Sequence, residues 1–375
     1  MKIDKIEVWA CDLPLPQPIN LGRFLVHRRS HLVVRMRAGD LVADCVTQSR
    51  GSPLDVIVAD LLAPRLIGRD IFEHRAIWTD IERELTAVET EGAVRRAWSA
   101  LDICLHDLRA KAAGLPLWRH LGGGCPEPVP VLIVEGYALP DEVGEAFVDR
   151  LAARVAEGFS MIKLEAGHYA EPRDLIGRLE KLREKVGQSA DIVLDFAWSW
   201  KQSKPHLAML DAIRHLGIAW IEDPFPSSAA SNYIALRRQT DLAIGCGDEC
   251  SSAADLFRLV ETEAVDLLRV DATAIGGVTA LEQLATAARR KKIRVSHHEH
   301  PETHEHCVFG FGIADHVEMF PTDRPFDQVH RIIEQSPFDR VRQGRLHPPT
   351  EPGTGVRLRL GEVERLARRH HSITQ

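Results

Sequence analysis

Three acidic residues stand at the ends of short apolar runs, at a nearly constant spacing. Asp195 follows Ile-Val-Leu, Glu222 follows Ile-Ala-Trp-Ile, and Asp248 follows Ala-Ile-Gly-Cys-Gly. Glu222 lies 27 positions after Asp195, and Asp248 lies 26 positions after Glu222. That is the length of a strand, a helix and two loops, so in a parallel barrel the three carboxylates would reach one rim. Oxygen ligands of this kind suit Mg²⁺. The alternative is that each acid caps the helix that follows it.

A lysine and a glutamate lie two positions apart in another apolar run, Met-Ile-Lys163-Leu-Glu165. Because side chains alternate along a strand, both should point to the same side. If that side is the inside of the barrel, a cation and an anion lie beside the metal. The alternative is a surface Lys-Glu pair.

A fourth acid, Asp271, ends a further apolar run, and the double glycine Gly276-Gly277 after it allows a close backbone approach. Its natural partner is a histidine at the end of the next strand, because a buried carboxylate holds imidazole in one tautomer and raises its basicity. That strand ends in His297-His298, which opens a segment with five histidines in ten residues. The segment could also be a solvated loop or a zinc-binding tract. A zinc amidohydrolase barrel would need His-x-His after the first strand, and residues 131–136 contain no histidine.

An alternation of apolar runs and amphipathic helices must position these residues. We expect eight strands, near Val129–Val134, Met161–Leu164, Ile192–Leu194, Ile218–Ile221, Leu242–Ile244, Val265–Val270, Ile293–Val295 and His316–Phe320. Helices are expected between them, as at Glu142–Ala156, Leu175–Val186, Leu207–Leu216 and Thr279–Lys291. This order favours a (β/α)₈-type barrel over an open sheet.

The segments on either side of the barrel have a different pattern. Residues 5–10 and 31–37 should be strands, residues 14–23 a loop, and residues 71–121 helical. The Gly- and Pro-rich stretch 122–128 indicates a linker. We therefore expect an N-terminal capping domain at 1–124, a barrel at 125–337, and a C-terminal segment at 338–375 that packs back on the cap.

Composition excludes several classes of protein. The chain of 375 residues has 47 basic and 54 acidic residues, a net charge of −7, and no basic run, so nucleic acid is not an expected partner. No apolar stretch approaches the length of a membrane helix, and the N-terminus lacks a signal-peptide core, so we expect a cytoplasmic protein. The seven cysteines form no CxxC pair and should be buried thiols. We also expect a homo-oligomer.

Four segments together resemble the enolase superfamily, and most closely its mandelate racemase subgroup. They are the helical stretch Ala97–Gly123, Trp220-Ile-Glu-Asp-Pro, Asp271 with Gly276-Gly-Val-Thr, and Pro352-Gly-Thr-Gly-Val. The resemblance covers nearly the whole chain. It implies an α/β protein with a modified (β/α)₇₋₈ TIM-type barrel that binds Mg²⁺. An α+β capping domain formed by the N-terminus and the C-terminal tail would close the barrel.

The resemblance also implies roles for single residues. Asp195, Glu222 and Asp248 fall on the metal-ligand positions, and the 23 positions from Asp248 to Asp271 favour Asp248 over its neighbour Glu249. The general-base position falls on His298 and not on His297, because Glu302, His306 and Glu318 then match downstream. Asp271 corresponds to the dyad partner of His298, and Glu318 to the acid that hydrogen-bonds the substrate carboxylate.

One position departs from the subgroup pattern. The second strand of the subgroup carries Lys-x-Lys, whose second lysine is the base on the other face of the substrate. Lys163 keeps the first position, but Glu165 stands at the second. A racemase needs an acid and a base on opposite faces. The departure therefore favours a Mg²⁺-dependent dehydratase of hydroxylated or sugar acids, a lyase of carbohydrate acid catabolism that uses one base.

Two other functions remain as alternatives. A racemase, epimerase or cycloisomerase of the same superfamily would need Lys163 or Glu165 to act on the opposite face. A non-catalytic sugar-acid binding protein would bind the small-molecule carboxylate without turnover. By resemblance, residues 18–24 and 49–52 close the barrel mouth, where Arg23 and Arg50 either bind a distal hydroxyl or carboxylate of the substrate or are surface arginines.

Overall fold

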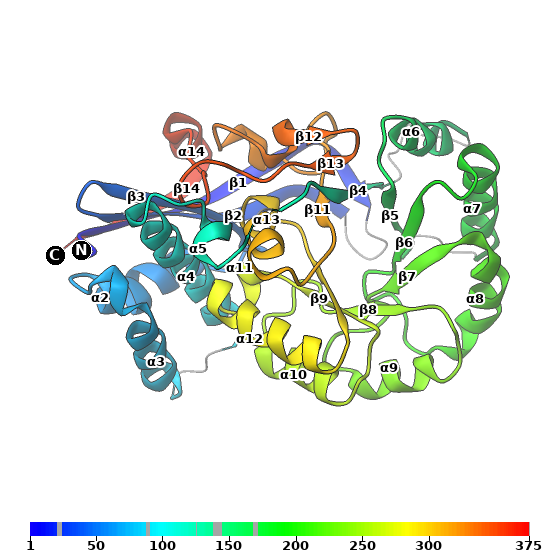
Figure 1. Cartoon of the computed structure of the whole chain (residues 1–375), viewed down its shortest axis with the longest axis horizontal. Coiled ribbons are helices and arrows are strands. Elements are labelled where there is room, and N and C mark those ends of the chain that lie inside the picture. Colours follow the sequence, from blue (N-terminus) through cyan, green and yellow to red (C-terminus); the bar gives the residue numbers. More distant parts are fainter. Residues whose placement is uncertain (21–24, 88–90, 125, 138–144, 168–171, 375) are drawn as a thin grey trace.

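The computed structural model of the chain describes residues 1–374 apart from 21–24, 88–90, 125, 138–144 and 168–171. A β-sheet built from both ends of the chain lies beside a barrel of strands with helices around its outside (Figure 1). We call the first part, residues 5–120 with 360–374, the cap. Strands and helices between residues 129 and 319 form the barrel.

The cap sheet has four antiparallel strands in the order β14-β1-β2-β3. These strands are β1 (Lys5–Asn20), β2 (Leu25–Ala38), β3 (Leu41–Gln48) and β14 (Ala367–Thr374). Lys5 pairs with Thr374, so the two chain ends lie side by side (Figure 1). The prediction that the C-terminal tail completes the cap is confirmed.

The predicted loop at 14–23 is wrong as far as residue 20, because strand β1 continues through it. Pro14 still pairs with Arg28, and the register then shifts before Ile19 pairs with Val26. Proline lacks the N–H that a ladder needs, so the pairing is irregular here while the chain stays extended. Residues 21–23 lie outside the described residues.

Helices cover the side of the cap sheet that faces the barrel. They are α1 (Leu54–Val56), α2 (Ala63–Leu66), α3 (His74–Leu85), α4 (Gly92–Ala112) and α5 (Leu117–His120), with a π-helical turn at Ile57–Leu62. Helix α4 is buried along almost its whole length, because it contacts β2 and β3 on one side and barrel helices α11 and α12 on the other. A Cβ atom on Gly277 would lie 2.2 Å from Asp102 Oδ2, so this glycine lets α12 approach α4. The predicted close approach at the double glycine is thus present.

Eight parallel strands form the barrel, at the eight predicted runs. They are β4 (Val129–Gly136), β5 (Met161–Glu165), β6 (Asp191–Asp195), β7 (Ile218–Glu222), β8 (Ile244–Cys246), β9 (Leu267–Val270), β10 (Arg294–His297) and β11 (Val317–Met319). The ladder runs from β10 in sequence order back to β4, which also pairs with β11. Within the described ranges no ladder joins β10 to β11, so hydrogen bonding does not continue across that junction. The predicted fold class is confirmed.

Helices alternate with these strands and lie outside them (Figure 1). They are α6 (Glu145–Ala156), α7 (Pro172–Val186), α8 (Leu207–Ile213), α9 (Ala230–Arg237), α10 (Ala253–Glu261), α11 (Ala272–Ile275), α12 (Gly277–Arg290) and α13 (Pro301–Phe311). Helix α14 (Leu360–Leu366) precedes β14 in the cap. No helix in the described part of the chain is long and apolar enough to cross a membrane. Six of the cysteines are buried free thiols, and Cys125 lies outside the described residues.

The direction of the barrel strands determines where the candidate site lies. Because all eight barrel strands are parallel, their carboxyl ends meet at one rim. The ends of β5, β6 and β10 and the start of β2 from the cap enclose a cavity of about 700 Å³ at that rim. The cavity therefore lies between barrel and cap.

Candidate active site

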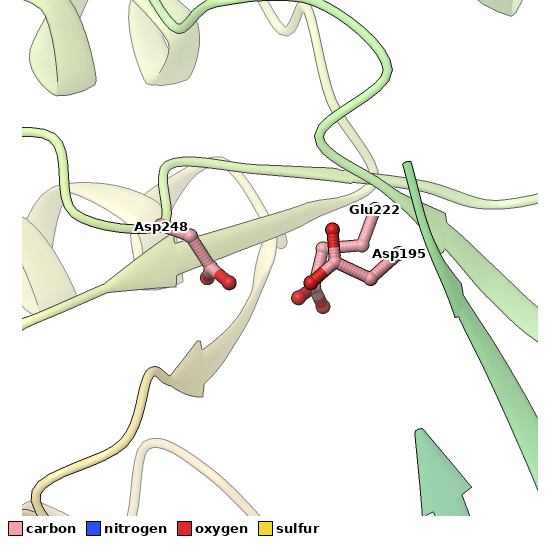
Figure 2. A group of neighbouring side chains, drawn as sticks. All are labelled: Asp195, Glu222 and Asp248. Carbon is pink, nitrogen blue, oxygen red and sulfur yellow. The ribbon is translucent and has the colours of Figure 1, made fainter. Parts of the chain in front are cut away.

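The three spaced carboxylates come together at the rim of the barrel. Asp195 ends β6, Glu222 ends β7, and Asp248 follows β8 by two residues. Each offers one oxygen, and these oxygens lie within 4.8 Å of one another (Figure 2). The period in the sequence thus predicted the cluster correctly. Helix capping by three unrelated acids does not explain this convergence.

The alternative ligand, Glu249, points elsewhere. Its carboxylate accepts a hydrogen bond from Arg50 Nε (2.6 Å) and lies 3.7 Å from Arg96 Nη2, both from the cap. Glu249 has a positive φ of 55°, which turns its side chain away from that of its neighbour Asp248. The structure therefore brings Asp248 into the cluster and pairs Glu249 with arginines of the cap.

The donor set fits a hard divalent cation. All three ligands are carboxylates, and Glu222 and Asp248 are buried. Trp220 Nε1 donates to Glu222 Oε2 (2.8 Å), whereas Glu222 Oε1 is buried and accepts no hydrogen bond. Glu222 Oε1 instead faces the Lys163 ammonium, and three carboxylates that converge within 4.8 Å are the oxygen ligands that a hard divalent cation prefers.

Lys163 projects from β5 into the same cluster, as the inward-facing alternative predicts. Its Nζ lies 3.1 Å from Asp195 Oδ2, 3.1 Å from Asp248 Oδ2 and 3.2 Å from Glu318 Oε2, and it also contacts Glu222. Burial lowers the pKa of this ammonium, but the four carboxylates outweigh burial and raise the pKa well above its usual value. The surface-pair alternative is wrong, because the side chain is 4% exposed.

Glu165 lines the cavity beside Lys163. The intervening Leu164 packs in the apolar core, as alternation along β5 requires. The backbone N–H of Gly167 donates to Glu165 Oε1 (2.8 Å). Burial raises the pKa of the Glu165 carboxyl well above its usual value, and the nearby charge of Asp195 raises it further. The residue that replaces the family's second lysine is thus in the cavity and favours its neutral form.

Of the two adjacent histidines, His298 faces the cavity. Its Nδ1 lies 2.9 Å from Asp248 Oδ2 and 3.4 Å from Glu318 Oε1, and its Nε2 lies 3.6 Å from Glu249 Oε1. His297 is buried in the barrel and stacks on His304, with ring centroids 4.9 Å apart. The structure therefore supports His298 as the candidate base position.

Asp271 and His298, which were predicted as a dyad, are not in direct contact. No hydrogen bond or ion pair within 4.0 Å joins these two described residues. Asp271 instead caps α11, since its Oδ1 accepts from Thr273 N (2.8 Å) and Thr273 Oγ1 (2.7 Å). Its nearest imidazole is His304, with Nε2 at 3.6 Å. Burial raises the pKa of Asp271, but the nearby histidines, His300 first, outweigh burial and lower it.

Glu318 on β11 completes the cluster. Its Oε1 accepts from the backbone N–H of Glu299 (3.0 Å), and its Oε2 contacts Lys163 and Arg269. Burial raises the pKa of Glu318, but Arg269 and Lys163 outweigh it, so the pKa is well below the usual range. The carboxylate is therefore charged and close to His298.

The histidine-rich segment is neither a solvated loop nor a metal tract. Residues 301–311 form helix α13, and His304 and His306 are fully buried in it. His306 Nδ1 accepts from the backbone N–H of Trp118, which fastens α13 to the cap. Among described residues, the acidic trio is the one group of three or more ligand side chains that could hold a metal ion.

Two arginines at the site, Arg29 and Arg269, were not predicted from the sequence. Arg29 lines the cavity from β2 and pairs with Glu299. Of the two arginines that were predicted, Arg50 lines the same cavity, and Arg23 lies outside the described residues. Arg269 lies beneath the metal carboxylates. Its sequence signal was a charged residue inside an apolar run, two positions before Asp271 and hence on the same side of the strand. Arg29 gave no comparable signal.

Comparison with known proteins agrees with this geometry. Residues 5–122 match the N-terminal domain of mandelate racemase / muconate lactonizing enzyme, and residues 146–363 match the enolase C-terminal domain-like family. A chloromuconate cycloisomerase from Pseudomonas putida is 29% identical over 378 residues, which is 95% of this chain and 96% of that protein.

Two further relatives carry dehydratase names. A D-galactonate dehydratase family member from Halomonas elongata is 25% identical over 346 residues, covering 79% of this chain and 84% of that one. The crystal structure of L-talarate dehydratase from Polaromonas sp. JS666, complexed with Mg and L-glucarate, superposes with a TM-score of 0.87 at 24% identity. It covers 100% of this chain and 99% of that chain, and at this identity it shows the shared fold.

Proposed function

The chain belongs to the mandelate racemase/muconate lactonizing enzyme family of the enolase superfamily, and from that premise we propose that it is a Mg²⁺-dependent dehydratase of hydroxylated or sugar acids. The proton α to the substrate carboxylate is removed, water is eliminated, and a 2-keto acid results. Membership makes the chain an enzyme of this superfamily, and the choice of dehydration is the proposal.

One observation carries this choice: of the described residues that line the cavity, His298 is the imidazole that contacts the metal cluster, and Glu165 stands at the position of the second lysine. His298 from the end of β10 and Glu165 from β5 line the same cavity. Racemisation needs a base on each face of the α-carbon, whereas dehydration can use one group twice. Glu165, whose Oε1 accepts from the backbone N–H of Gly167, puts a carboxyl group and not an amine at the position of the second base.

His298 carries both proton transfers of the proposed reaction. The Nδ1 atom of His298 is engaged by Asp248 and Glu318, so Nε2 is the atom that takes the α-proton. The protonated imidazole then donates to the β-hydroxyl as the C–O bond breaks and water leaves. The remaining enol takes a proton from solvent to give the 2-keto acid. A 2,3-dihydroxy acid is therefore the required substrate unit.

The surrounding charges support proton removal. When bound by Asp195, Glu222 and Asp248, Mg²⁺ supplies a Lewis acid that draws electron density from the substrate carboxylate. The Lys163 ammonium adds a positive charge at the same place. Asp271 acts on His298 through space and not by contact, and its Oδ1 accepts two hydrogen bonds from Thr273.

Arginines of the cap favour a polar or acidic distal end on the substrate. Arg29 and Arg50 line the cavity from the cap, each beside a glutamate of the barrel. A cavity of about 700 Å³ accommodates a small sugar acid. A planar guanidinium can bind a carboxylate or two hydroxyls with paired hydrogen bonds.

A second candidate is a cycloisomerase or epimerase. The similarity to chloromuconate cycloisomerase over 95% of the chain favours it. This alternative would require Lys163 or Glu165 to exchange a proton on the face opposite to His298.

A single screen separates these activities. The protein is incubated in D₂O with Mg²⁺ and a library of aldonic and aldaric acids, and 2-keto acid formation and deuterium in recovered substrate are both measured. Formation of a 2-keto acid supports the dehydratase. Recovered substrate with deuterium and inverted configuration would replace it by an epimerase. A Mg²⁺-dependent thermal shift without turnover of any acid would indicate a non-catalytic binding protein.

A further inference from the structure

Arg269 on β9 is fully buried beneath the candidate metal site. Its side chain is 0% exposed, and it is among the largest fully buried side chains of the described chain. The neighbours Leu268 and Val270 belong to the apolar core. An arginine in this position therefore needs an explanation, because a buried charge costs more in desolvation than its pairing commonly returns.

Each of the three guanidinium nitrogens of Arg269 donates to at least one acceptor. Nε donates to Asp248 Oδ1 (2.7 Å) and lies 3.0 Å from Glu222 Oε2, while Nη2 donates to Glu318. Nη1 donates to Ser296 Oγ and to the backbone carbonyl of His297 (2.7 Å). Arg269 thus bridges two of the three metal carboxylates and anchors them to strand β10.

The bonds divide the oxygens of each ligand. Arg269 contacts Oδ1 of Asp248 and Oε2 of Glu222, and Trp220 holds the same Oε2. The other oxygen of each residue, Asp248 Oδ2 and Glu222 Oε1, faces the Lys163 ammonium, where the oxygens of the cluster converge. Arg269 therefore holds one oxygen of each carboxylate, and the other oxygen turns to the point where the cluster converges, with Asp248 Oδ2 also 2.9 Å from His298 Nδ1.

Ser296 keeps the guanidinium itself in place. Its hydroxyl accepts from Arg269 Nη1 and lies 2.7 Å from His316 Nε2. His316 Nδ1 lies 2.7 Å from Asp315 Oδ1, so a chain of polar contacts supports Arg269 from the opposite end of the barrel. Such outer contacts orient metal ligands in many sites.

We propose that Arg269 is a positioning residue for the divalent cation, which holds Asp248 and Glu222 in the orientation that binds Mg²⁺. The inference deepens the proposed function and rests on its metal site. Mutation of a residue that orients metal ligands commonly weakens metal binding by about 10- to 100-fold.

The sign of the effect separates orientation from charge. Removing a positive charge next to a cation site would by itself strengthen cation binding. Loss of orientation has the opposite effect, because freed carboxylates must be ordered again when the ion binds. Weaker Mg²⁺ binding by folded protein after neutralisation of Arg269 therefore does not come from the direct repulsion between the guanidinium and the ion, and it supports a role of Arg269 in preparing the carboxylates.

The test is calorimetric titration of the full chain with MgCl₂, without substrate. Arg269→Gln should raise the Kd for Mg²⁺ by about 10-fold or more, and Arg269→Lys by a smaller factor, because an ammonium can restore only part of the fork. Arg183→Gln is the matched control. Arg183 is also a buried arginine, but its bonds go to backbone carbonyls of residues 187, 190, 216 and 217, which precede the strands β6 and β7 and so lie at the end of the barrel opposite to the metal carboxylates.

Each outcome decides the matter. Equal or tighter Mg²⁺ binding by folded Arg269→Gln overturns the inference, as does equal weakening in Arg183→Gln. If Arg269→Gln does not fold, Ser296→Ala takes its place, and unchanged Mg²⁺ binding in that variant counts against the proposal. Wild-type protein that binds no Mg²⁺ would refute the proposed function itself, so the two failures are distinguishable.

Discussion

Nη1 of Arg29 lies 3.1 Å from Oε1 of Glu299, and this pair joins strand β2 of the cap to the residue that follows His298. Both side chains are buried, with 3% and 9% exposed, and Gln48 from β3 also donates to Glu299. Arg29 Nε donates to the carbonyl of Phe326 (2.8 Å). The position of the cap is thereby coupled to the backbone that carries the candidate base.

This pair should make stability depend on pH in the acid range. Burial raises the pKa of Glu299, but Arg29 outweighs it and lowers the pKa from 4.5 to about 2. The stabilisation is therefore complete above about pH 4.5 and is lost as pH falls toward 2, by on the order of 3 kcal/mol. Urea unfolding between pH 2.5 and 6 measures this change in the free energy of unfolding. Glu299→Gln should flatten this dependence, whereas Glu180→Gln, on the exposed face of α7, should leave it unchanged.

Replacement of His298 should remove the chemistry and leave the fold intact. His298→Asn should reduce turnover by about 10²–10⁴-fold or more, because the other imidazole among the described cavity residues, His27, comes from the cap strand β2. Exchange of the α-proton with D₂O should fall equally, as measured by NMR. The control is His215→Asn, an exposed histidine in the turn between α8 and β7. Full activity in His298→Asn would refute the assignment of the base.

The acidic trio should make stability depend on Mg²⁺. At a free Mg²⁺ concentration of 100 times Kd, binding stabilises the folded state by about 2.7 kcal/mol, and EDTA should abolish this gain in thermal unfolding. Glu222→Gln should abolish it too, since its carboxylate is a proposed ligand. Glu249→Gln should keep it, because Glu249 pairs with Arg50 on the cap. The reverse pattern would transfer the ligand role to Glu249.

Lys163 should be needed for folding stability when Mg²⁺ is removed. Its ammonium contacts four carboxylates, and Lys163→Met leaves them without this counter-ion. Loss of one partner from a buried ion pair costs about 3–5 kcal/mol, so urea unfolding in EDTA should show a loss of this size, which Mg²⁺ partly restores. Lys185→Met, which breaks an exposed pair with Asp149, should cost less than about 1 kcal/mol. Unchanged stability and turnover in Lys163→Met would remove Lys163 from the site.

Features set by local pattern were predictable from the sequence. Alternating apolar runs placed all eight barrel strands, and the strand-helix period placed Asp195, Glu222 and Asp248 at one rim. Alternation within β5 put Lys163 and Glu165 on one side. Each depends on distances along the chain that regular secondary structure converts directly into positions in space. The fold and the metal cluster could therefore be predicted from the sequence.

Contacts between distant side chains were decided only by tertiary structure. Asp271 caps α11 and lies beside His304, and the pairing with His298 that the sequence favoured is absent. Arg29 and Glu299 are 270 positions apart, and nothing in either segment indicates the other. A side chain chooses among several partners by rotamer, burial and charge, and these are defined only after the cap has docked on the barrel. For this protein the sequence determined which residues reach the rim, and the folded structure determined which of them touch.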